Sequence, residues 1–437
     1  MIRAAFAVFV AITLAFPARA AVDIQEVTSP GGIEAWLVEE RTIPFTAIEI
    51  RFRGGASLDA PQLPGAVNLM MALLEEGAAD MDAREFAEAR ERLAASIEFD
   101  TFGDSVSVSA RFLTENRDEA IALLRTALME PRFDDDAIER VRAQVLSIIR
   151  SDSTNPNRIA SRTFDTLAYG NHPYARPRNG TLESVPRITR EDLIDAHARV
   201  FARDRVYVGA VGDIGPEDLG DLLDALLGDL PAEGAPLPPR ADFLLPGGVS
   251  VVPFDTPQSV ALFGHRGIAR DDPDFFAAFV ANEIFGGSGF QSRLMQEVRV
   301  ARGLTYGIGT WLFAMDLSEL VMGQVASAND RMAETLEVVR AEWARMAEEG
   351  VKQEELDAAQ TFLTGAYPLR FDGNGRIARI LVGMQMDGLD ADYVNTRNDK
   401  INAVTLEDIA RVVARIYRPE DLHFVVVGQP EGVEATN

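Results

Sequence analysis

Two segments that lie 216 residues apart carry the same sequence pattern, and this internal repeat constrains the fold more than any other feature of the chain. Residues 189–193 recur as residues 405–409, and the alignment continues without a gap to apolar runs that end at Gly212 and Gly428. Each copy has the pattern of a capped helix followed by a short buried strand. A repeat of this length predicts two domains of similar fold.

A stretch rich in proline and glycine, residues 231–248, separates the two copies. Such a composition resists helix formation and favours an extended chain. We therefore expect an N-terminal domain at 22–230, a linker at 231–248 and a C-terminal domain at 249–437. The length of 437 residues also exceeds what one hydrophobic core normally supports.

Each domain is predicted to begin with strands and to continue with long helices. Residues 47–52 and 105–112 alternate apolar and polar side chains, which is typical of half-buried strands, and residues 260–264 play the part of the first strand in the second domain. The elements do not follow a regular βαβ alternation, which favours an α+β sandwich with helices on one face of a mostly antiparallel sheet. The predicted helices are 66–76, 83–96, 115–129, 134–150, 273–286, 330–348 and 352–365.

The first twenty residues predict a secretory signal peptide. A basic start at Arg3 precedes an apolar run at 4–16, and the small residues Ala18 and Ala20 provide the pattern of a cleavage site. We expect cleavage after Ala20 and a periplasmic mature protein with no membrane span. The alternative is an uncleaved membrane anchor, but the apolar run is short for a span of about twenty residues.

The mature chain is predicted to be strongly acidic. The formal net charge is −26 at pH 7, and loss of Arg3 and Arg19 with the signal peptide makes it −28. Such a charge repels phosphate backbones, so we expect no nucleic-acid partner. The chain has no cysteine, which excludes thiolate catalysis and thiolate metal ligands.

Four stretches together carry a family resemblance: residues 52–59, 169–174, 286–294 and 299–306. Their order within a duplicated chain resembles the pitrilysin/insulinase family of zinc metallopeptidases. That family includes the mitochondrial processing peptidases and the core proteins of the respiratory bc1 complex. The resemblance covers nearly the whole mature chain.

Active members of that family carry His-x-x-Glu-His on a helix, where residues i and i+4 share one face and two imidazoles can bind zinc. The intervening glutamate acts as general base on a zinc-bound water. In the register that the resemblance implies, counted from Gly65, these positions hold Asn68, Met71 and Ala72. The helix at 141–150, where a further glutamate ligand is expected, has no acidic residue. We therefore predict that this chain binds no zinc.

The sequence offers little support for another metal or acid–base site. Glu75 and Glu76 are adjacent, so they point about 100° apart on a helix and do not converge. His172 and Tyr174 lie in the second of the four stretches. Each of them either lines a cleft of the first domain or belongs to a turn. We expect capping, surface and core roles for the four histidines, which lie far apart: His172, His197, His265 and His423.

The second domain keeps a pair that the resemblance marks as functional. In that family an arginine and a tyrosine seven residues apart reach into the zinc cleft, bind the substrate backbone and help to stabilise the oxyanion. Here they are Arg299 and Tyr306. A phenol that donates to a developing oxyanion is chemically well suited to this task. The alternative is an exposed helix arginine and an ordinary strand tyrosine.

The glycine-rich stretch at 286–289 lacks the Gly-Lys-Ser/Thr ending of a phosphate-binding loop. The resemblance implies that the same region is a loop lining the cleft. We therefore predict that Gly287, Ser288, Gly289 and Phe290 contact the substrate.

These observations favour a non-catalytic, substrate-binding subunit of a heterodimeric periplasmic zinc peptidase. The zinc would be bound by a related partner that carries His-x-x-Glu-His, and unfolded peptides would be the substrates. The chain alone is expected to be inactive. The alternative is a structural or peptide-binding scaffold without a part in catalysis, like the bc1 core proteins. An autonomous hydrolase is disfavoured because no Gly-x-Ser-x-Gly motif is present.

Overall fold

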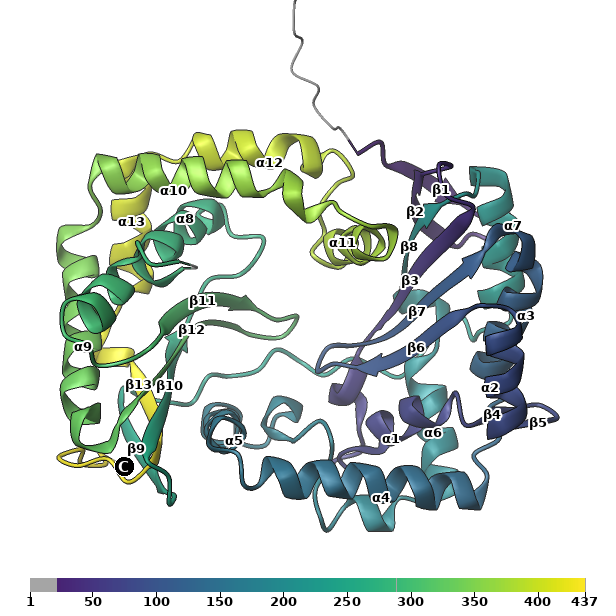
Figure 1. Cartoon of the computed structure of the whole chain (residues 1–437), viewed down its shortest axis with the longest axis horizontal. Coiled ribbons are helices and arrows are strands. Elements are labelled where there is room, and N and C mark those ends of the chain that lie inside the picture. Colours follow the sequence, from purple (N-terminus) through teal and green to yellow (C-terminus); the bar gives the residue numbers. More distant parts are fainter. Residues whose placement is uncertain (1–21, 288, 437) are drawn as a thin grey trace, which may run out of the picture.

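The computed structural model describes residues 22–287 and 289–436. The predicted signal peptide and the predicted contact residue Ser288 lie outside the described residues. In the described part, each half of the chain builds one large β-sheet, and these two sheets stand on opposite sides of the molecule (Figure 1).

The N-terminal half builds a six-stranded sheet in the order β1-β2-β8-β3-β7-β6. Its neighbouring strands are antiparallel except for β2 and β8, which are parallel. Strand β8, which belongs to the repeat, is therefore an inner strand, as its buried apolar side chains require. The strands are β1 (Gln25–Thr28), β2 (Glu34–Glu39), β3 (Phe45–Arg53), β6 (Ser96–Thr101), β7 (Ser105–Leu113) and β8 (Val206–Gly212), with a separate small hairpin of β4 (Gly77–Ala78) and β5 (Met81–Asp82).

The C-terminal half builds a five-stranded sheet in the order β11-β12-β10-β13-β9, and β13 and β9 form its one parallel pair. Read from β9 to β11, the strand order corresponds to β2-β8-β3-β7-β6 of the first sheet. Each pair of neighbouring strands has the same relative direction, parallel or antiparallel, in both sheets. The predicted fold of two similar domains with mostly antiparallel sheets is confirmed. The strands are β9 (Gly248–Pro253), β10 (Gln258–Arg266), β11 (Ile308–Ala314), β12 (Glu319–Ala328) and β13 (His423–Gly428).

The repeated segments form the same helix in both halves. Thr189 caps α6 (Arg190–Val200), and Thr405 caps α13 (Leu406–Ile416). In both cases the threonine side chain accepts a hydrogen bond from the backbone of an aspartate three residues later, whose side chain accepts one in return. These paired caps satisfy backbone donors that a helix start leaves open.

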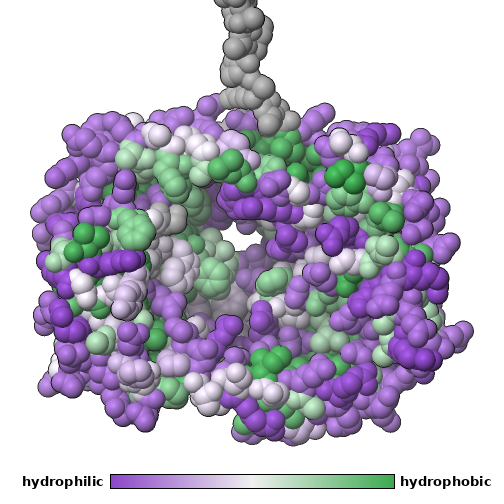
Figure 2. Space-filling view, in the orientation of Figure 1, coloured by the Kyte–Doolittle hydropathy of each residue, from purple (hydrophilic) through white to green (hydrophobic). Residues whose placement is uncertain are grey.

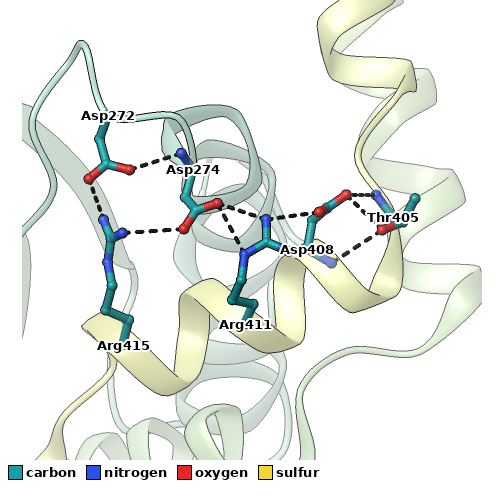
Figure 3. A network of polar contacts seen from close by, with 6 residues as sticks. All are labelled: Asp272, Asp274, Thr405, Asp408, Arg411 and Arg415. Atoms are coloured by element: carbon teal, nitrogen blue, oxygen red, sulfur yellow. Dashed lines mark hydrogen bonds and ion pairs between the residues drawn. The ribbon is translucent and has the colours of Figure 1, made fainter.

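Helix α13 is also tied to the segment that precedes α8 (Phe275–Gly286), as Figure 3 shows. Arg411 donates to Asp274 at 2.7 Å, and Arg415 donates to Asp272 at 2.6 Å and to Asp274 at 3.2 Å. The network fixes the start of α8, the helix that leads into the glycine-rich stretch.

Most of the remaining helices pack on the outer face of the sheet of their own half, where they share one core cluster with it (Figure 1). The helices of the N-terminal half are α1 (Ala66–Leu73), α2 (Ala83–Arg92), α3 (Arg117–Met129), α4 (Asp135–Asp152) and α7 (Pro216–Leu227). Those of the C-terminal half are α8, α9 (Met332–Glu349), α10 (Gln353–Ala366) and α12 (Tyr393–Asn402).

Two corresponding helices cross to the sheet of the other half. Helix α5 (Pro156–Tyr169) packs on β10 and β13, and α11 (Asn374–Met386) packs on β3 and β8. Each sheet therefore has helices of its own half on one face and a single helix from the other half on its second face. At Gly209 of β8 an added Cβ would stand 2.6 Å from the carbonyl oxygen of Ala378 in α11, so this approach requires glycine.

Residues 231–247 connect the halves without forming a helix or strand. An opening passes between the two halves near the centre of the molecule (Figure 2). Within residues 22–287 and 289–436, no helix combines the length and apolar character that crossing a bilayer demands.

Candidate functional site

The start of α1 is held by a buried carboxylate. Asp59 accepts hydrogen bonds from the backbone N–H groups of Gly65 at 2.7 Å and Val67 at 2.8 Å. Burial raises the pKa of this carboxyl to about 6, although the two N–H donors act in the opposite direction. A negative charge at a helix N-terminus is favourable, so Asp59 fixes the helix that would carry a zinc motif.

Two segments that are distant in sequence meet beside this cap. Gly65 has a left-handed φ of 96°, and a Cβ on it would lie 2.8 Å from the backbone of Gly180. The hydroxyl of Ser184 donates to the carbonyl oxygen of Pro64 at 2.8 Å. The framework that positions α1 is thus built by residues that are distant in sequence.

The zinc positions on α1 hold no suitable ligands. Met71 is only 1% exposed and belongs to the hydrophobic core, while Asn68 and Ala72 are half-buried one turn apart. A thioether in the core and a methyl group cannot replace a general base and an imidazole. In the described part of the chain no three histidine, cysteine or acidic side chains come together as a metal site would need. These residues therefore do not fit a zinc ion.

The histidines have structural partners. His172 donates to the carbonyl oxygen of Pro239 in the connecting segment at 2.9 Å, and His197 donates to that of Leu128 at 2.7 Å. His265 accepts from the indole N–H of Trp343 at 3.0 Å. His423 contacts the carbonyl oxygen of Pro246 and the hydroxyl of Ser250. Burial lowers the pKa of His197, His265 and His423.

The C-terminal half contains an open groove of about 480 Å³ where α8 ends and β11 begins. Arg299 and Tyr306 both line it, so the structure brings this predicted pair into one cavity. Gly287, Gly289 and Phe290 line it as well. Trp311 and Thr310 belong to the wall on β11, and neither was predicted from the sequence.

Arg299 lies in a π-helical turn, Met295–Val300, a rare geometry that is frequent at functional sites. Its guanidinium stacks on the ring of Phe290, 4.5 Å from the centroid. Tyr306 is 84% exposed and lines the same groove. The wall therefore presents one stacked cation and one accessible hydroxyl.

The groove wall is anchored to the core. Arg293 donates both arms of its guanidinium to Glu355 of α10, at 2.7 and 2.6 Å. The side chain of Gln296 donates to the carbonyl oxygen of Phe290 at 2.5 Å. A bidentate pair of this kind is strong and directional, so the wall is a preformed surface.

The groove and the degenerate zinc helix are not brought together within the chain. Helix α1 lies in the N-terminal half, whereas α8 and β11 lie in the C-terminal half across the central opening (Figure 1). Arg299 and Tyr306 therefore do not contact Asn68, Met71 or Ala72.

Tyr174, for which the sequence left a cleft role and a turn role open, joins the two halves. Its hydroxyl donates to Asp104 of the β6–β7 turn at 2.5 Å and accepts from the backbone of Leu317 at 2.9 Å. Nearby, Arg53 at the end of β3 forms an ion pair with Asp316 at 3.1 Å. These contacts connect the β6–β7 turn to the β11–β12 turn of the other half.

Comparison with known proteins shows where this architecture occurs. Residues 36–182 match the family profile described as Insulinase (Peptidase family M16), and residues 187–363 match the one described as Peptidase M16 inactive domain. Together the two matches cover about three quarters of the chain.

The chain is similar to individual proteins over nearly its full length. It is 28% identical to the "Non-peptidase homolog YmxG" of Helicobacter pylori, over 89% of this chain and 90% of that protein. The crystal structure of a peptidase M16 inactive domain from Pseudomonas fluorescens matches with a TM-score of 0.87 at 28% identity, over 95% of this chain and 99% of that one. A chain of Complex III2 from Candida albicans matches with a TM-score of 0.78 at 15% identity, over 94% and 98%, a likeness of fold alone.

Proposed function

Because this chain belongs to the insulinase peptidase family M16, and lacks its zinc motif, we propose that it is the substrate-binding subunit of a two-chain zinc peptidase. The partner is a related chain with His-x-x-Glu-His, which holds the zinc. The substrates are unfolded peptides. This chain contributes Arg299 and Tyr306 to the partner's site.

The observation that carries the proposal is the contrast between the two halves. Arg299 and the 84% exposed Tyr306 share one preformed groove, while the zinc positions on α1 hold residues that supply neither the histidine ligands nor the general base. An accessible phenol and a guanidinium in one groove suit the stabilisation of an oxyanion. This chain has no zinc-bound water of its own. In the proposal, a second chain therefore supplies the zinc and its bound water.

Strand β11 supports a peptide substrate. It pairs only with β12 among the described strands, so it is the edge of its sheet, and it forms one wall of the groove. An edge strand offers unpaired backbone groups to an extended peptide, whose side chains then fall alternately on each face. Trp311 and Phe313 are both partly exposed on this strand and provide apolar contacts.

The test is peptide hydrolysis and zinc content of the purified mature chain, alone and mixed with the His-x-x-Glu-His protein expected to be encoded beside it. We expect no zinc and no turnover for the chain alone, and turnover on mixing. Tyr306→Phe should then lower kcat about 100- to 1000-fold, because one oxyanion donor is removed. Thr361→Ala, on the exposed face of α10, is the matched control and should leave turnover unchanged.

Two outcomes contradict the proposal. Zinc-dependent turnover by this chain alone would mean that it contains a site of its own. Unchanged turnover of Tyr306→Phe in an intact complex would favour the scaffold alternative, in which the chain binds or supports without taking part in catalysis.

We also propose a periplasmic location, from the signal-peptide pattern of the first twenty residues. Protein recovered from the periplasmic fraction should begin at Ala21. An intact Met1 on membrane-bound protein would instead support the uncleaved anchor.

A further inference from the structure

A second cavity, of about 450 Å³, lies among α8, α10, α11 and α12, away from the groove of Arg299 and Tyr306. Of these helices, α11 crosses to the N-terminal sheet and lies next to the central opening (Figure 1). Its wall combines cations with aromatic rings. Its charged residues are Arg270, Arg370, Arg376, Arg379, Arg397 and Asp387, and its rings include Phe275, Tyr367 and Tyr393.

The charge of this cavity runs against that of the chain. The whole chain has 68 acidic and 42 basic residues, yet the cavity is lined by five arginines and one acidic residue, Asp387. Asp387 is paired with Arg270 at 3.4 Å. The buried Glu49 also interacts with Arg379, but it is paired with Arg51. The two carboxylates cannot neutralise five guanidinium groups, so the lining keeps an excess of positive charge.

Two of the arginines are fixed parts of the wall. Arg397 is buried, donates to the carbonyl oxygen of Leu363 at 3.2 Å and stacks on Tyr367 at 4.3 Å. Arg270 stacks on Phe275 at 4.3 Å and donates to the hydroxyl of Tyr393 at 3.1 Å. Stacking of this kind holds the guanidinium planes in place.

The other three arginines lack such partners. The side chains of Arg370, Arg376 and Arg379 are exposed and make no hydrogen bond or ion pair with any residue that the structure describes. Arg376 and Arg379 are three positions apart on α11, so they project from one side of the helix. Their ten N–H donors remain available to a ligand.

One of the two arginines on α11 has a counterpart in the other half. Helix α5 begins 218 residues before α11, and in that alignment Arg158 of α5 matches Arg376, whereas Ser161 matches Arg379. Arg379 therefore belongs to one copy only, where the repeated fold does not require it.

We propose that this cavity binds a peptide through a carboxylate, with an adjacent apolar side chain against the aromatic rings. Guanidinium groups bind carboxylates in a bidentate, planar geometry, and aromatic rings favour an apolar neighbour. The volume admits one or two residues of a peptide, not a folded domain. The choice of a peptide rests on the proposed function; the carboxylate is either the C-terminus or an acidic side chain.

The test measures binding of fluorescein-labelled peptides to the mature chain alone by fluorescence anisotropy. The probe is an unstructured peptide that ends in Glu-Phe with a free carboxylate. We expect Arg376→Ala with Arg379→Ala to weaken binding at least about tenfold, because two charge-assisted contacts are lost. Both side chains are exposed, so folding should persist, which circular dichroism and the unfolding midpoint will verify.

The matched control replaces two exposed arginines outside the cavity, Arg111→Ala with Arg162→Ala, and should bind as the wild type does. Amidation of the C-terminus and replacement of the peptide's glutamate by glutamine separate the two sources of the carboxylate. Weaker binding of either modified peptide supports the proposal and identifies which carboxylate the cavity binds. Equal affinity for the wild type and the Arg376/Arg379 variant, or for both modified peptides, would overturn it.

This binding is measured without the partner, so it is independent of the catalytic proposal. If the mixed chains fail to turn over while binding still depends on Arg376 and Arg379, the two-chain peptidase is wrong and the carboxylate site stands.

Discussion

Asp165 on α5 is a half-buried carboxyl with no hydrogen bond or ion pair to another described residue. Burial raises its pKa to about 7 from 3.8. A raised pKa means that the folded state binds the proton more tightly than the unfolded state. The contribution of this group to stability therefore falls as the pH rises between about 4 and 7.

We expect Asp165→Asn to stabilise the chain more at high pH than at low pH. The variant keeps the shape of the side chain but cannot ionise. Its gain in the free energy of unfolding should increase by about 2 kcal/mol between about pH 5.5 and about pH 8.5. Urea unfolding at both pH values measures this gain, and Asp221→Asn at an exposed position is the control. A gain that does not grow with pH would show that Asp165 is not desolvated.

Gly65 makes a second prediction at the residue scale. Alanine there must adopt a φ of 96° and meets the backbone of Gly180 at 2.8 Å, so Gly65→Ala should destabilise the chain by about 2–4 kcal/mol. Gly365 on α10 has open space around it, and Gly365→Ala should stabilise by about 0.5–1 kcal/mol. Unfolding midpoints of both variants measure the difference, and a neutral Gly65→Ala would contradict the close approach.

Single residues also show how far the sequence could lead to the candidate sites. Arg299 and Tyr306 could be identified because they are seven positions apart in a recognisable stretch. The arginine cavity could not, because its lining residues run from Arg270 to Arg397 and come from several helices. Trp311 was also missed, since an exposed aromatic side chain on a strand looks like core from sequence alone.

At the scale of elements, local patterns predicted most helices within a few residues. The exception at 83–96 is instructive: α2 ends at Arg92, because Ala94 takes a left-handed φ of 50°. The crossing of α5 and α11 was not predicted. An apolar face shows that a helix is buried, but it carries no information on which of two similar sheets will cover it.

The paired caps allow a prediction at this scale. Thr189→Ala and Thr405→Ala should each lower the free energy of unfolding by about 1 kcal/mol, because each removes one capping hydrogen bond. The sites belong to different halves, so the double variant should show the sum. Denaturant unfolding measures all three. Thr361→Ala, inside α10, lacks a capping role and should change stability little; an equal loss there would contradict the assignment.

At the scale of the whole molecule, the exchanged helices make each half depend on the other. The face of the C-terminal sheet that includes Leu262 and Val425 is buried against Phe164 and Ala168 of α5. The opposite sheet buries Val211 against Leu381 of α11. If either half unfolded alone, the second face of the remaining sheet would be exposed to water. The hydrogen bonds that Tyr174 makes between the halves would also be lost.

This interdependence predicts one cooperative thermal transition for the whole chain, although it contains two similar domains. Phe164 is fully buried on α5, so Phe164→Ala should cost about 3–5 kcal/mol. The loss should lower the single midpoint and leave no second transition, because the cavity lies between the two halves. Scanning calorimetry at one heating rate compares the wild type with this variant and with Phe362→Ala, a half-exposed position on α10 that should have little effect. Two transitions in the wild type, only one of them shifted by Phe164→Ala, would mean that the halves unfold separately and that the exchanged helices do not couple them.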